Sequence, residues 1–125
     1  MSPIAQAAAL LAAAIHLLFF VMESVTFTRP ETYHRFFVAS QGDAEILRPW
    51  ALNQGFYNLF LAVGAVAGVV AVNAGQVDAG RALVLFACGS MAAAGIVLLA
   101  TDRRFLRPAL IQAVPPLVAI AAWFL

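Results

Sequence analysis

Residues 50–72 read WALNQGFYNLFLAVGAVAGVVAV. This run is long enough to cross a bilayer, because a spanning helix needs about 20 mostly apolar residues. The run also contains the polar block Asn53–Asn58, and polar side chains that face lipid are energetically costly. The stretch therefore predicts a membrane-spanning helix that turns a polar face toward other helices.

Three further apolar runs extend this prediction to the whole chain. They predict spans over residues 4–27, 79–101 and 109–125, with Ser2 and Pro3 capping the first helix. The composition agrees, since 64% of the residues are hydrophobic and 10% are charged, too few charges to cover a soluble domain. The first run lacks a basic start and carries Glu23, which excludes a signal peptide. We predict one all-α domain over 1–125, an antiparallel four-transmembrane-helix bundle.

The connections between the predicted spans are unequal in length. Residues 28–48 form the only long one, and Pro30–Phe37 within it mixes aromatic and charged residues. That mixture predicts a short interfacial helix between spans 1 and 2, lying at the level of the headgroups. Asp43 is expected to cap a final turn over 44–47 before the second span. Pro115 and Pro116 are expected to kink the fourth span.

The arginines predict the orientation of the protein in the membrane. Six of the seven lie in the first and third connections: Arg29, Arg35, Arg48, Arg103, Arg104 and Arg107. By the positive-inside rule these connections face the cytoplasm and both termini face outward. The net charge of +1 offers no basic patch, so nucleic acid is excluded as a partner.

Polar residues from several spans fall at one predicted level. Glu23 lies about 6 Å from the cytoplasmic end of its span, and His16 about 16 Å from that end on the same face. We predict one cavity open toward the cytoplasmic leaflet, lined by Glu23, His16, Asn53, Gln54, Tyr57, Asn58 and Gln112.

Each of these residues also has a purely structural interpretation. Amides and tyrosines in spans often only join helices, and a lone histidine is more often a hydrogen-bonded core residue than a ligand. An intramembrane carboxylate is a functional candidate by default, although Glu23 could pair with Arg48 or Arg107. Small residues such as Gly64 and Gly68 predict close packing within the chain, or a homo-oligomer.

Two segments resemble a known family. Ile15–Ser24 (IHLLFFVMES) and Asn53–Ala62 (NQGFYNLFLA) are similar to the small bacterial four-span membrane proteins grouped as domain of unknown function 1304. The resemblance covers essentially the whole chain. It implies residence in a bacterial inner membrane and implies no activity.

Three functions agree with these features. In the first, the protein binds or transforms a small lipophilic molecule entering from the bilayer. Glu23 and His16 would then move a proton while Asn53, Gln54, Tyr57, Asn58 and Gln112 orient the ligand. The alternatives are a proton-coupled exporter acting as a homodimer and a structural subunit of a membrane assembly. Small multidrug-resistance transporters share the chain length and one carboxylate, but the arginine bias argues against their dual insertion.

No cofactor is expected from the sequence. There are too few candidate ligands for a metal site and no Cys-x-x-Cys motif. A haem bound by His16 has little support, because a single histidine in a span is weak evidence for a haem ligand.

A labelling experiment can test the predicted topology. Cysteines introduced as Gln76→Cys and Arg104→Cys should react from opposite sides of an intact cell, because they lie in successive connections. Membrane-impermeant thiol reagents would measure this. Labelling of both positions from the same side contradicts the topology.

Overall fold

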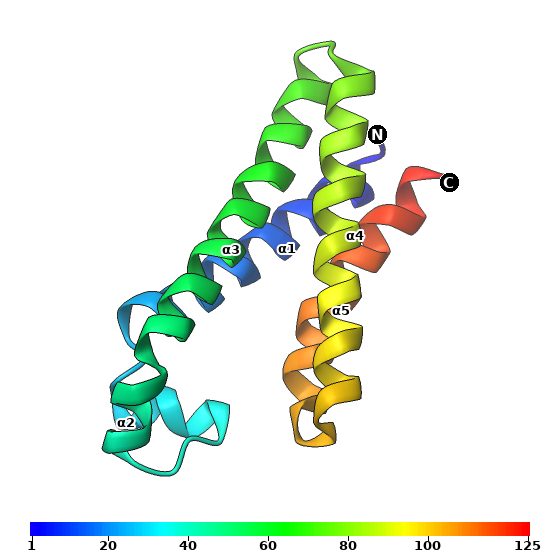
Figure 1. Ribbon diagram of the computed structural model, residues 1–125. Coiled ribbons are helices and arrows are strands. Elements are labelled where there is room, and N and C mark those ends of the chain that lie inside the picture. The colour runs from blue at the N-terminus through cyan, green and yellow to red at the C-terminus, as the bar shows by residue number, and fades with distance from the viewer. The chain divides into compact units, whose positions relative to one another are not determined.

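Four helices in the computed structural model, which describes residues 1–125, are long and apolar enough to cross a membrane. They span Pro3–Val25, Gln41–Asn73, Val77–Thr101 and Arg103–Trp123. The structure contains no strand, and a short helix lies between the first and second of these segments. The prediction of an all-α fold with four spans and a short intervening helix is therefore confirmed (Figure 1).

The structure divides into two units that are described separately. The first comprises Met1–Ile15 and Leu61–Leu125, and the second comprises His16–Phe60. Helices α1 (Pro3–Phe20) and α3 (Gln41–Asn73) each contribute one part to the first unit and one part to the second. The first unit also contains α4 (Val77–Thr101), the 3-10 turn η3 (Arg103–Phe105) and α5 (Leu106–Trp123).

Small side chains form the core of the first unit. Its two buried clusters draw on parts of all four long helices: Ala8, Ala9, Val69, Val84, Cys88 and Ala119 in one, and Ala12, Ala13, Ala62, Ala65, Ala87 and Met91 in the other. Alanine and glycine let helix backbones approach closely, which is the main source of association where lipid removes the hydrophobic driving force. The alanine-rich start of α1 and the glycines Gly64 and Gly68 of α3 therefore act in packing within the chain.

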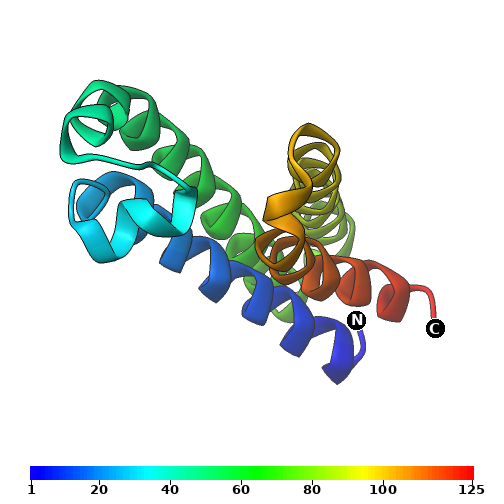
Figure 2. The same ribbon diagram turned by 90° about the horizontal axis from the view of Figure 1, so that it is seen from below.

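Both termini lie toward the end of the first unit that carries the α3–α4 turn (Figure 1), and Figure 2 shows the two termini near each other. The Ser2 hydroxyl donates a hydrogen bond to the Ala122 carbonyl at 3.2 Å, and the Asn73 amide donates to Gln6 Oε1 at 3.0 Å. Ser2 Oγ also accepts from the Ala5 backbone N–H at 3.1 Å, so Ser2 caps α1 as predicted. The helices at this end alternate in direction as an antiparallel bundle requires.

Helix α5 bends between its orange and red parts in Figure 1. Pro115 and Pro116 lie inside this helix, and each lacks the backbone N–H that would continue the hydrogen-bond ladder. The expected kink in the fourth span is therefore observed, and Pro116 is buried in the unit.

The second unit contains the end of α1, a π-helical turn η1 (Val21–Val25), α2 (Pro30–Tyr33), the 3-10 turn η2 (His34–Phe36) and the first part of α3. Phe27, Tyr33 and Ala44 form its buried cluster. The Phe27 and Phe36 rings pack with centroids 5.6 Å apart. The aromatic residues of the long connection thus hold α2 against the start of α3.

Helix α3 begins at Gln41, well before the predicted start of the second span at Trp50. Ser40 Oγ accepts a hydrogen bond from the Asp43 backbone N–H at 3.2 Å, so Ser40 is the cap. The prediction that Asp43 caps a separate turn is wrong, because Asp43 lies inside the first turn of α3. The helix continues through Pro49, where the chain is exposed and the freed carbonyl of Glu45 can be hydrated.

Helices α3 and α4 approach each other closely at Gly68 of α3 and Gly80 of α4. A Cβ on Gly80 would lie 2.6 Å from the Gly68 carbonyl oxygen and 2.7 Å from the Val72 backbone nitrogen. These neighbours are backbone atoms and cannot move aside independently of the helix.

We expect Gly80→Ala to destabilise the protein by about 1–3 kcal/mol, the usual cost of overpacking. Gly89→Ala on the same helix is the matched control, since a Cβ there has no neighbour within 4 Å. Thermal unfolding in detergent, followed by circular dichroism, would measure both. Equal stability of the two variants contradicts the close approach.

The native Cys88 bears on the labelling experiment at positions 76 and 104. Its side chain is fully buried, so the parent chain should react little with thiol reagents.

Candidate functional site

Glu23 lies in the middle of a π-helical turn that ends the first span. The turn covers Val21–Val25, and the Thr26 backbone N–H donates to the Val21 carbonyl at 2.9 Å, a separation of five residues. Turns of this kind are rare and occur frequently at functional sites. The wider turn begins between His16 and Glu23, so the regular helical spacing that placed both side chains on one face does not describe this part of the helix.

The carboxylate of Glu23 is hydrogen-bonded on one side only. Asn58 of α3 donates from Nδ2 to Glu23 Oε1 at 2.9 Å. Asn58 is buried and Glu23 is partly buried. No side-chain or backbone donor of the chain bonds the second oxygen, Oε2. One oxygen therefore fixes the side chain and the other remains available to a further donor or a proton.

Ser24, the next residue, joins the same two helical segments. Its hydroxyl donates to the Leu52 carbonyl at 2.8 Å. It fits against Gly55, where an added Cβ would overlap Ser24 Oγ and lie 3.0 Å from the Ser24 backbone nitrogen. The Phe20 and Phe56 rings complete the contact edge to face, with centroids 5.2 Å apart. These contacts place Glu23 opposite Asn58.

Glu23 and Asn58 are the two predicted site residues that a hydrogen bond joins. Asn53, Gln54 and Tyr57 are exposed. Asn53 and Tyr57 lie two residues from Gly55 on either side, which turns them toward another face of α3. Gln54 lies one turn before Asn58, on the same face of α3.

The other two predicted residues lie further along the chain. His16 is fully buried at the start of the second unit, and its ring packs edge to face on Phe19 with centroids 5.4 Å apart. Gln112 belongs to the first unit, where its side-chain amide donates to the Met91 carbonyl at 3.4 Å. That bond connects α5 to α4, as an interhelical amide often does.

Sequence reasoning missed the positioning roles of Ser24 and Gly55. A signal was present for Gly55, because glycine inside a helix costs about 1 kcal/mol relative to alanine and suggests a close contact. The π turn left no signal in the residue pattern. The chain brings no three His, Cys, Asp or Glu side chains together, so the carboxylate lacks companions for a metal.

Gly55 offers a direct test of this contact. We expect Gly55→Ala to destabilise the protein by about 1–3 kcal/mol, because the new methyl group would displace Ser24 from Leu52. Gly42→Ala is the control on the same helix, since its Cβ would meet only Ser40 Oγ, at 4.0 Å. Thermal melting in detergent would compare them. A Gly55→Ala protein as stable as Gly42→Ala would show that the two segments do not pack in this way.

Comparison with known proteins gives a family for the chain. The comparisons with curated proteins and with solved structures returned no match. The family model described as "Protein of unknown function (DUF1304)" matches residues 10–124, which include both segments of the Glu23 site. The chain belongs to this family.

Proposed function

We propose that this membrane protein binds a small lipophilic molecule at Glu23 and exchanges a proton with it. The observation that carries the proposal is the half-bonded carboxylate, with Oε1 held by Asn58 and Oε2 lacking a donor from the chain. Glu23 lies in an apolar segment long enough to span a membrane, where an ionisable group is costly and marks a functional site by default.

The surroundings of Glu23 suit an apolar ligand with one polar group. The Phe56 ring packs against the Phe20 ring, with centroids 5.2 Å apart, and against the Phe60 ring, at 6.2 Å, so the two helical segments that carry Glu23 and Asn58 also present aromatic side chains. A hydroxyl or amine of the ligand would donate to Oε2, and the same oxygen could release or receive the proton. Ligand pockets commonly combine such apolar surfaces with few polar groups.

Other residues would assist this chemistry in the proposed mechanism. Gln54 offers an exposed amide on the turn before Asn58, where it could orient the polar group of the ligand. His16, seven residues before Glu23, is a second group on the same helix able to carry a proton. Asn53 and Tyr57 face another side of α3 and are not needed for contact with the Glu23 carboxylate.

The experiment compares Glu23→Gln with the wild type. Gln keeps the shape of Glu and retains an oxygen that accepts from Asn58, so stability should be nearly unchanged. The variant cannot exchange a proton, and it loses the charge-assisted hydrogen bond to the ligand. We expect native mass spectrometry to find a co-purifying lipophile on the wild type and about tenfold or more lower occupancy on Glu23→Gln.

Glu45→Gln is the matched control. Glu45 lies in the same unit, is exposed and accepts a hydrogen bond from Gln41 that a glutamine oxygen would preserve. Equal ligand occupancy in Glu23→Gln and Glu45→Gln, together with unfolding of Glu23→Ala, would make Glu23 a structural residue. A stable two-chain complex that moves a substrate against a proton gradient would instead support the exporter.

A further inference from the structure

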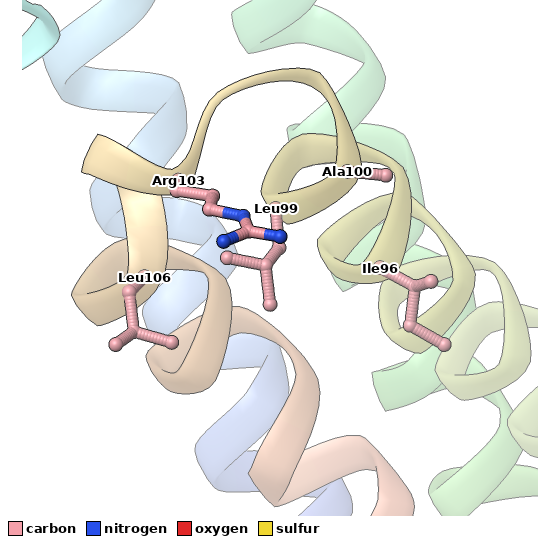
Figure 3. Close-up of a pocket in the computed structure, with 5 residues that line it drawn as sticks. All are labelled: Ile96, Leu99, Ala100, Arg103 and Leu106. Atoms are coloured by element: carbon pink, nitrogen blue, oxygen red, sulfur yellow. The ribbon is translucent and has the colours of Figure 1, made fainter.

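A shallow depression lies at the corner where α4 passes into α5, within the first unit. Its volume is about 440 Å³, and it is lined by Ile96, Leu99, Ala100, Arg103 and Leu106. Figure 3 shows the Arg103 guanidinium beside Leu99, with the side chains of Ile96 and Leu106 on either side. One cationic group thus stands over an otherwise apolar surface.

The depression lies at the boundary between two candidate spans. Val77–Thr101 ends and Arg103–Trp123 begins at this corner. Ile96 is five residues before the end of α4, about 8 Å along the helix axis. The apolar lining therefore extends toward the hydrocarbon while the guanidinium of Arg103 stays at the level of the headgroups.

The charges near the corner are unevenly compensated. Asp102 is bound by Arg104, with Nη2–Oδ2 at 2.8 Å and Nε–Oδ2 at 3.0 Å. Hydrogen bonds from the Arg104 side chain and backbone lower the pKa of Asp102, so this carboxylate stays ionised and engaged. Arg103 and Arg107 have no carboxylate partner in the chain. The corner therefore carries two uncompensated positive charges.

We propose that this depression binds an anionic phospholipid. The phosphate would accept hydrogen bonds from the Arg103 guanidinium, a geometry that arginine favours. One acyl chain would lie against Ile96, Leu99 and Leu106. Ile96 and Leu106 are 63% and 48% exposed, so the chain itself leaves this surface uncovered. A soluble anion would use only the guanidinium, whereas a phospholipid matches both parts of the site.

The test uses the full chain in a neutral detergent, titrated with phosphatidylglycerol or phosphatidylcholine and read by native mass spectrometry. We expect phosphatidylglycerol to bind more tightly than phosphatidylcholine. Arg103→Gln should weaken phosphatidylglycerol binding about fivefold, the effect of one arginine near an anionic headgroup. Arg81→Gln is the control, because Arg81 lies on α4 near its other end, over the Phe124 ring.

Ala100→Trp tests the apolar part of the site. The indole would occupy the depression without removing a charge, so phosphatidylglycerol binding should fall while helical content and melting temperature stay unchanged.

Equal binding of the two lipids, or equal loss in Arg103→Gln and Arg81→Gln, would overturn the proposal. Full competition by millimolar inorganic phosphate would also overturn it, since it would show that the site recognises only the anion. Glu23→Gln should bind phosphatidylglycerol as the wild type does, which separates this site from the proposed function.

Discussion

The hydrogen bond from the Asn58 amide to the Glu23 carboxylate joins two helical segments that have few other polar contacts. A carboxylate in an apolar segment must find a donor, because lipid supplies none. Three neighbouring features position the donor and the acceptor of this hydrogen bond. The π turn sets the direction of Glu23, Gly55 allows the backbone of α3 to approach Ser24, and the Ser24–Leu52 bond holds that approach. Removing the close approach would separate donor from acceptor.

The sequence was a good guide to the number and type of helices because membrane spans obey simple constraints of length and polarity. Helix boundaries were less predictable. The start of α3 at Gln41 depends on the Ser40 cap, and the helix continues through Pro49 because a proline is tolerated where the freed carbonyl is exposed. Hydropathy describes the part of a helix that crosses lipid and says little about its extension into the polar region.

The site was predictable in part, and the reason lies in helix geometry. An acidic residue in an apolar span can be recognised from the sequence as a candidate site residue. Asn58 can be recognised as an amide at a similar predicted depth in the membrane. Which of the neighbouring polar residues faces Glu23 depends on the rotation of α3, and the pattern Asn53–Asn58 places polar groups on more than one side. The π turn added a second uncertainty, because it changes the rotation of Glu23 relative to His16 without altering the composition.

Along α1 and α3, the residues that pack the helices together lie in one unit, and the residues proposed for the chemistry lie in the other. In Met1–Ile15 and Leu61–Asn73 these helices carry alanine and glycine, which pack closely, and a hydrogen bond between Asn73 and Gln6 joins the two helices near their ends. In the His16–Phe60 unit the same helices carry the carboxylate, the amides and the phenylalanines. Stability alone gives little reason for Glu23 and Asn58, since two apolar side chains of similar size would join the segments at least as well. A carboxylate with one oxygen left open is better explained by a ligand or a proton that binds there.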